Sequence, residues 1–251
     1  MSEPEAAAER RRLLVVAAHP DDIEFGAAGT IARWTDEGWD ARYVIVTSGQ
    51  RGVQDPRQDP DEFGRLREDE SRAAAKVCGV EDVTFLRYMD SEVTHSQRLL
   101  KDLSRQFRRH RPHRLMTMQP DLLPASFFIN HPDHRTVATA TLDIVMTGGT
   151  TAGIFPELML EEGLPPWREL EDIWLMGPGE GTEVVDISTT FERKIASLDA
   201  HASQMAQVEG SLRERLAARL AAVGEPHGYA YAESFRVIDR RWPPPRPRPA
   251  P

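Results

Sequence analysis

The chain has 251 residues, 40% of them hydrophobic, and a net charge of −9, so it is long enough to bury a substantial core. The acidic balance argues against a nucleic-acid partner, which would require a basic field, and against docking on anionic lipid. No apolar run reaches the roughly 18–20 residues of a membrane span, and no signal peptide is evident. The single cysteine, Cys78, excludes an internal disulfide and a cysteine-built zinc site, and it favours a reducing cytoplasm.

The chain alternates strand-like and helix-like stretches. Short apolar runs predict strands at 13–18, 41–49, 83–88, 114–119, 173–177 and 183–187. Composition and spacing predict helices at 23–37, 64–78, 96–109, 132–146 and 191–223, the last with a break near Gly210. Because alternating strands and helices pair in parallel through right-handed crossovers, the pattern predicts one doubly wound, mostly parallel α/β domain.

The two ends of the chain lack a core pattern. Residues 1–12 are rich in Ala, Glu and Arg, and residues 242–251 are rich in proline, which favours extended polyproline II. Both are predicted to be disordered, and they flank a single folded domain at 13–241. Polar or proline-rich stretches predict long loops, a frequent location of function, at 49–63, 119–130 and 147–171.

The first candidate site is His19-Pro20-Asp21-Asp22, which directly follows the strand at 13–18. Proline suits the first turn of a helix, and sites in open α/β sheets form where strands end and helices begin. His19 and Asp22 are three residues apart, so one turn can aim both at a metal ion such as zinc or iron. Asp21 is expected to point elsewhere, free of partners and ionised by the helix N-terminus. The alternative is that one aspartate merely caps the helix.

The second candidate is His131-Pro132-Asp133-His134-Arg135, where Asn130 is the expected cap of the next helix. One of the two histidines can complete a His-Asp-His metal shell while the other remains free for proton transfer. Taken alone, the motif also fits two surface histidines. Taken together, the two His-Pro-Asp turns can face each other across one edge of the sheet, which favours a metal site.

Weaker candidates are substrate contacts near strand ends. They are Arg51, Arg67 and Asp90, for which structural pairing is an equal alternative, and His201, for which a solvated helix face shared with Lys194 is the default. No GxGxxG, GxxxxGK[ST] or GxSxG pattern follows a strand, so dinucleotide, P-loop and simple serine-hydrolase functions lack their motifs.

At these residues the chain resembles a known family. AAHPDDIEFGAAGT (17–30) and HPDHR (131–135) resemble the signature motifs of the zinc-dependent deacetylases related to N-acetylglucosaminyl-phosphatidylinositol de-N-acetylase, the LmbE-like or PIG-L family. Weaker similarity covers most of 13–236, through 47–49, 65–80, the region of Asp90, 194–204 and 232–236. The resemblance implies a Rossmann-like fold and a mononuclear metal site, with Zn²⁺ or Fe²⁺ as the ion and ligands from His19, Asp22 and His134.

The resemblance also implies the catalytic roles. Asp21 would be the general base, a protonated His131 would stabilise the oxyanion or act as an acid, and Asp133 would orient a histidine of its own motif. The implied substrate is a small N-acetylated amino sugar or amino-sugar conjugate, hydrolysed to acetate and a free amine. Gln50, Ile129 and Asn130 depart from common family residues, which leaves the substrate open.

Two other functions remain as hypotheses. One is an amidase that cleaves a larger acyl group from a glycosyl-thiol conjugate. The other is a metal-containing sugar-binding module without turnover, against which the complete set of ligands, base and electrophile argues. The sequence is compatible with a homo-oligomer and decides neither the oligomeric state nor the metal.

Overall fold

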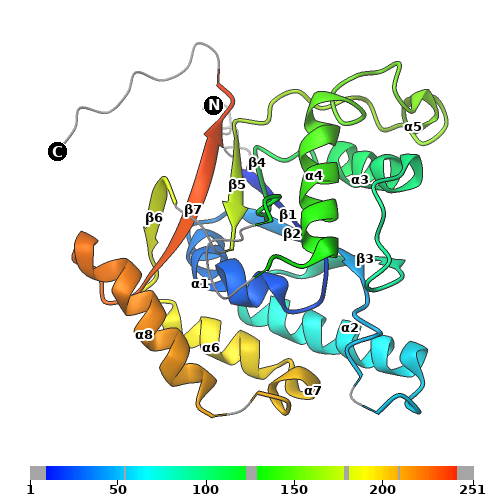
Figure 1. Cartoon of the computed structure of the whole chain (residues 1–251). Coiled ribbons are helices and arrows are strands. Elements are labelled where there is room, and N and C mark those ends of the chain that lie inside the picture. Colours follow the sequence, from blue (N-terminus) through cyan, green and yellow to red (C-terminus); the bar gives the residue numbers. More distant parts are fainter. Residues whose placement is uncertain (1–9, 54, 123–128, 178–180, 209, 242–251) are drawn as a thin grey trace, which may run out of the picture.

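The computed structural model of the chain describes residues 10–53, 55–122, 129–177, 181–208 and 210–241. Seven strands form a sheet in the order β3-β2-β1-β4-β5-β7-β6 (Figure 1). The strands are β1 (Arg12–Ala17), β2 (Asp40–Thr47), β3 (Asp82–Tyr88), β4 (Arg114–Met118), β5 (Asp172–Met176), β6 (Glu183–Asp186) and β7 (Ala232–Asp239). The first five in chain order pair in parallel, and β7 is antiparallel to both β5 and β6. The predicted doubly wound α/β domain is confirmed.

Helices cover both faces of this sheet (Figure 1). They are α1 (Asp22–Asp36), α2 (Pro60–Val77), α3 (Gln97–His110), α4 (Pro132–Met146), α5 (Pro156–Leu160), α6 (Phe191–Asp199), α7 (Ala202–Met205) and α8 (Leu212–Gly224), followed by a 3-10 turn at Glu225–His227. Helix α3 packs with α4, and α6 packs with α1 and α2, so two helical layers enclose the sheet. None of the helices in the described ranges is long and apolar enough to cross a membrane.

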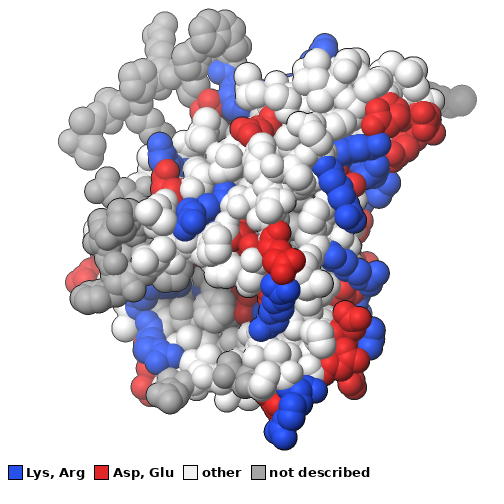
Figure 2. Space-filling model, turned by 45° about the vertical axis from the view of Figure 1, so that its right-hand side comes forward, with Lys and Arg blue, Asp and Glu red and all other residues white. Residues whose placement is uncertain are grey.

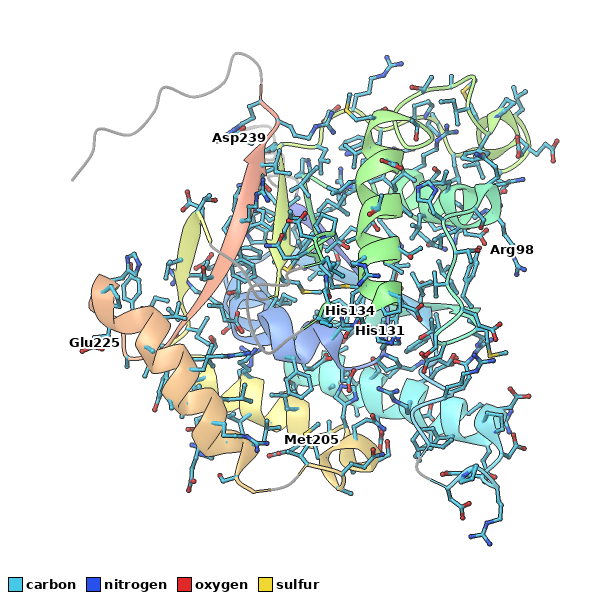
Figure 3. The ribbon with its side chains drawn as sticks, in the orientation of Figure 1. Arg98, His131, His134, Met205, Glu225 and Asp239 are labelled. Carbon is cyan, nitrogen blue, oxygen red and sulfur yellow. The ribbon has the colours of Figure 1, made fainter. Side chains whose placement is uncertain are left out.

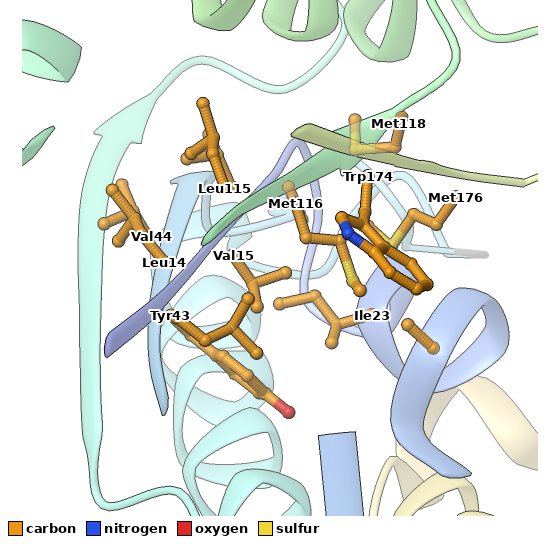
Figure 4. Close-up of a cluster of buried hydrophobic side chains, with 14 of the residues drawn as sticks. Leu14, Val15, Ile23, Tyr43, Val44, Leu115, Met116, Met118, Trp174 and Met176 are labelled. Atoms are coloured by element: carbon orange, nitrogen blue, oxygen red, sulfur yellow. The ribbon is translucent and has the colours of Figure 1, made fainter. Parts of the chain in front are cut away.

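The core forms around β1, the central strand. Residues 13–17 are all at most 1% exposed, because helices cover both faces of the strand, and this explains its continuous apolar run. Figure 4 shows Val15 of β1 among Tyr43, Met116 and Trp174 from the neighbouring strands. On the face in Figure 2, Lys and Arg side chains lie interspersed with Asp and Glu, as on an ordinary solvated surface.

Several predicted boundaries are wrong. The helix predicted at 191–223 is three helices. The predicted break near Gly210 is confirmed between Met205 and Leu212, and a further break lies at Ala200–His201, where His201 turns inward. Helix α2 begins at Pro60 and α5 lies within 147–171, so two predicted loops are shorter. Arg12 already belongs to β1. Residues 1–9 and 242–251 of the predicted disordered ends, and residues 123–128 of the predicted loop at 119–130, lie outside the described residues.

Strand β7 has no counterpart among the predicted strands. Its sequence, AESFRVID, mixes charged and apolar residues and therefore hides the period-two pattern. Glu233 is nevertheless 3% exposed, because it pairs with the fully buried Lys194. The buried ion pair between Lys194 and Glu233 thus allows β7 to join the sheet although its composition is polar.

The order of the strands determines where a site can form. β1 pairs with β2 on one side and with β4 on the other, so crossovers leave these neighbours in opposite directions. The carboxyl ends of β1 and β4 lead into residues 18–22 and 119–131. Both His-Pro-Asp motifs therefore lie at one edge of the sheet, at its topological switch point.

Candidate active site

The first motif forms a strained turn between β1 and α1. Asp21 is the N-cap of α1 with φ of 118°, a left-handed conformation that non-glycine residues rarely adopt and that is common at functional sites. Its side chain makes no capping bond and instead lies 3.2 Å from Nη2 of Arg67. Arg67 also donates to the carbonyls of Pro20 and Gly49 at 2.8 and 2.9 Å. Asp21 is therefore held by a buried arginine, and the expectation that it is free of partners is wrong.

The second motif opens α4, with Pro132 in its first turn as predicted. The N-cap is His131, whose Nδ1 accepts a hydrogen bond from the Asp133 backbone N–H at 3.2 Å. The expectation that Asn130 is the cap is wrong. Its amide instead bridges the Gln119 carbonyl, at 2.8 Å, and the His134 ring. Figure 3 shows His131 and His134 at the start of α4, next to α1.

Three side chains from the two motifs converge. His19 Nδ1 lies 3.2 Å from His134 Nε2 and 3.5 Å from Asp22 Oδ2, and His134 Nε2 lies 3.0 Å from Asp22 Oδ1. Ligands bonded at about 2.0–2.1 Å to one tetrahedral ion stand about 3.3 Å apart, so this spacing fits a metal ion. Donor atoms within 4.8 Å of one another also occur in the groups His19-His131-His134 and His19-Asp90-Asp133.

Each of the two histidines in this set, His19 and His134, has a second partner on its other nitrogen. His19 Nε2 lies 3.2 Å from Asp90 Oδ1 and 3.3 Å from Asp133 Oδ2. His134 Nδ1 lies 3.2 Å from the Asn130 side-chain oxygen. Such contacts orient the ring and direct the opposite nitrogen to the metal. The Asp133 carboxylate faces His19 and accepts the backbone N–H groups of Ser91 and Val93. Within its own motif Asp133 contacts His131 through its backbone N–H, and its carboxylate serves the histidine of the first motif.

The electrostatics of the site favour a cation. Burial alone would lower the pKa of His19, but the carboxylates of Asp22, Asp133 and Asp90 outweigh it and raise that pKa to about 12. Against the cost of its burial, His134 and His19 hold the pKa of Asp22 well below its usual value. Three carboxylates crowded around two histidines form a donor set that matches a divalent ion.

The pKa values of Asp21 and His131 both differ from those that the sequence leads one to expect. Burial raises the pKa of Asp21 to about 6 despite the opposing charge of Arg67, so the helix N-terminus does not dominate this group. Burial and then the charges of His19 and His134 lower the pKa of His131. A neutral His131 that accepts at Nδ1 carries its proton on Nε2 and can donate there.

The four weaker candidates have distinct environments. Asp90 contacts His19, and Arg67 holds Asp21, so both belong to the site. Arg51 is exposed and pairs with Glu92. His201 is fully buried, 3.2 Å from Glu24 in the first turn of α1, so the prediction of a solvated face is wrong.

A cavity of about 640 Å³ opens beside the ligands. Asp22 and His134 form one end of it, and side chains from β4, β5, β7 and α8 continue its walls. The contribution of α8 and β7 is absent from the predicted site. No motif signals it, because these residues come together only when the last strand returns antiparallel across the sheet.

The structure is a doubly wound α/β sheet with His and Asp side chains gathered at its switch point, an arrangement that could hold a metal ion. Residues 14–145 match the PIG-L family, described as GlcNAc-PI de-N-acetylase, and the chain belongs to that family. This confirms the resemblance seen in the two motifs.

Individual relatives agree with this assignment. The chain is 28% identical over 229 residues to diacetylchitobiose deacetylase of Thermococcus kodakarensis, covering 91% of this chain and 83% of the relative. It is 29% identical over 234 residues to 1D-myo-inositol 2-acetamido-2-deoxy-alpha-D-glucopyranoside deacetylase of Mycobacteroides abscessus, covering 78% and 82%. The structure of N,N'-diacetylchitobiose deacetylase from Pyrococcus horikoshii superposes with a TM-score of 0.83 at 28% identity, covering 91% of this chain and 84% of that one.

Proposed function

We propose that this protein is a metal-dependent N-deacetylase that hydrolyses the acetamido group of an N-acetylglucosamine conjugate. The convergence of His19, Asp22 and His134 at 3.0–3.5 Å, next to the buried carboxyl of Asp21, carries the proposal. Membership of the PIG-L family and the two deacetylases named above support it.

The ligand set we propose is His19, Asp22 and His134. His19 can give one nitrogen to a metal, and its Nε2 is already engaged by Asp90 and Asp133. Nδ1 is therefore the ligating atom, and Asp90 and Asp133 act as its outer-sphere partners. Zn²⁺ is the ion we favour, because three His and Asp ligands leave it one open position, and Fe²⁺ suits the same donors.

The proposed chemistry divides between the metal and the side chains. When bound, the metal polarises the amide carbonyl and acidifies the attacking water. Asp21 accepts the proton of that water as its oxygen adds to the carbonyl carbon. The Nε2–H of neutral His131 donates to the developing oxyanion, in place of the protonated ring expected from the sequence. Asp21 then returns its proton to the nitrogen as the C–N bond breaks, which releases acetate and the free amine.

The test is an amine-release assay on N-acetylglucosamine, N,N′-diacetylchitobiose and N-acetylglucosaminyl glycosides. We expect activity that a chelator abolishes and that added Zn²⁺ or Fe²⁺ restores, with one acetate formed per amine. A larger acid released in place of acetate would identify the amidase. Absence of turnover with zinc, iron and cobalt on every substrate would refute the proposal in favour of a sugar-binding module.

A further inference from the structure

The cavity beside the proposed ligands is lined by residues from several elements along the sheet edge, namely α1, β4, β5, β7 and α8. Its near end is formed by Asp22 and His134, which follow β1 and β4. Its far walls come from the end of β5, from the start of β7 and from α8, which packs on β7. A ligand that reaches the metal can therefore continue past β4 and β5 toward α8.

Much of the cavity wall is apolar. Its apolar lining residues are Phe25, Met118, Met176, Leu220, Val223 and Ala232. Gly26 belongs to the same wall, and a side chain there would meet Met176 Sδ at 2.9 Å. The space is therefore lined by close-packed hydrophobic atoms, a suitable environment for an uncharged hydrocarbon or aromatic group.

The part of the wall that α8 contributes holds a cation that has no partner among the described residues. Arg219 of α8 lines the cavity, and it makes no hydrogen bond or ion pair with any residue in the described part of the chain. Arg213 on the same helix pairs with Glu192, in contrast. The cavity's own carboxylate, Glu233, is neutralised by Lys194 at 2.7 Å. Among the described lining residues, the charge offered to a ligand away from the proposed metal ligands is therefore positive.

We propose that the cavity is the subsite for the aglycone, and that the substrate is an N-acetylglucosaminide whose aglycone joins an apolar segment to a terminal anionic group. This inference rests on the proposed function and names its substrate class. The acetamido group lies at the metal, the apolar segment lies along Phe25 and Met176, and the anion pairs with Arg219. The planar guanidinium binds a carboxylate or a phosphate through two parallel hydrogen bonds, so either anion fits.

The test compares glycosides that differ only at the far end. The probes are the hexyl, 5-carboxypentyl and 6-phosphohexyl glycosides of N-acetylglucosamine, assayed by amine release with the zinc-loaded enzyme. We expect kcat/KM to rise from N-acetylglucosamine to the hexyl glycoside and again to one of the two anionic glycosides, and the better anion identifies the terminal group. Arg219→Gln is expected to lower the ratio of the anionic to the hexyl kcat/KM about tenfold to hundredfold.

Matched variants separate the subsite from a general effect of charge or stability. Arg213→Gln removes the same charge from the same helix outside the cavity, and we expect it to leave the ratio unchanged. Val223→Ser is expected to reduce the preference for the hexyl glycoside over N-acetylglucosamine about fivefold, whereas Ala222→Ser, on the exposed side of α8, has no such effect.

Equal ratios of anionic to hexyl kcat/KM in Arg219→Gln and Arg213→Gln would overturn the proposal. So would faster cleavage of N-octanoylglucosamine than of the hexyl glycoside, because the cavity would then hold the acyl chain.

Binding measured without turnover distinguishes failure of this inference from failure of the proposed function. Calorimetric titration of the zinc-free protein should give tighter binding of the 5-carboxypentyl or 6-phosphohexyl glycoside than of the hexyl glycoside, and Arg219→Gln should remove the difference. Binding with this preference but without amine release would refute the deacetylase and retain the subsite. Amine release without the preference would refute the subsite alone.

Discussion

His19 presents its two ring nitrogens to different partners, and this makes it the residue on which the site depends. Nδ1 faces Asp22 and His134, whereas Nε2 faces Asp90 and Asp133. Asp133 is 1% exposed and also accepts two backbone N–H groups, so its position is set before any metal binds. A fixed partner on Nε2 makes Nδ1 the better ligand.

Replacing Asp133 should therefore weaken the metal site without removing a ligand. We expect Asp133→Asn to lower zinc affinity about 10–100-fold, because the ring loses its anionic partner. Competition with a chromogenic chelator measures this. Asp143→Asn, an exposed change on the same helix, is the control and should bind zinc like the unmodified protein. Equal affinities in both variants would show that Asp133 has no role at the metal.

Replacing Asp21 tests whether this residue acts as the general base or as a metal ligand. Asp21→Ala is expected to reduce turnover by a factor on the order of 10²–10⁴, because the water loses its proton acceptor, while one zinc per chain is retained. Steady-state kinetics and metal analysis of the same preparation give the two numbers. Loss of zinc together with activity would instead make Asp21 a ligand.

Cys78, in contrast to Asp21, is a titratable group that burial makes unreactive. Burial raises the pKa of its thiol to about 12, so the reactive thiolate is scarce at neutral pH in the folded protein. We expect negligible reaction with a disulfide reagent at pH 8 in the native state and one thiol per chain in denaturant. Rapid native labelling would contradict the buried environment.

At the scale of elements, α1 is held by an ion pair contributed by α6 and β7. Lys194 donates to the carbonyls of Glu24 and Phe25, and Glu233 accepts the N–H groups of Gly29 and Thr30. The pair thus contacts successive turns of the helix whose first turn carries Asp22. A segment close to the end of the chain in this way positions a motif close to its start.

Breaking this pair should be costly. Lys194→Met leaves Glu233 charged and buried, and we expect the free energy of unfolding to fall by about 3–5 kcal/mol. Arg213→Met at the exposed pair with Glu192 should cost less than about 1 kcal/mol. Urea denaturation of both variants compares them. If Lys194→Met also costs less than about 1 kcal/mol, the pair does not secure α1.

At the scale of the whole molecule, the proposed metal site joins residues 19–22 and 131–134, which lie more than a hundred residues apart in sequence. The proposed ligands follow β1 and β4, which hydrogen-bond directly, so metal binding would link the halves of the sheet at their switch point. Without a cation, Asp22, Asp90 and Asp133 remain close together around His19.

Metal removal should therefore destabilise the entire fold. At a free zinc concentration 100-fold above Kd, binding contributes about 2.7 kcal/mol, which corresponds to a fall in Tm of roughly 5–10 °C on chelation. Calorimetry with and without chelator measures the shift, and Asp22→Asn should abolish most of it. An unchanged Tm would mean that the ion does not bridge the two segments in the folded protein.

The fold class, the two His-Pro-Asp turns and the family could be predicted from the residues alone. Continuous apolar strands with intervening helices are recognisable locally, and so is a His-Pro-Asp turn at the end of a strand. Other relations became visible only in three dimensions: Asp133 contacts His19, Arg67 holds Asp21, His201 and Lys194 are buried, and β7 and α8 complete the cavity with Arg219. These relations depend on which distant segments become neighbours in the sheet, and on burial that overrides the ordinary preference of charged side chains for water.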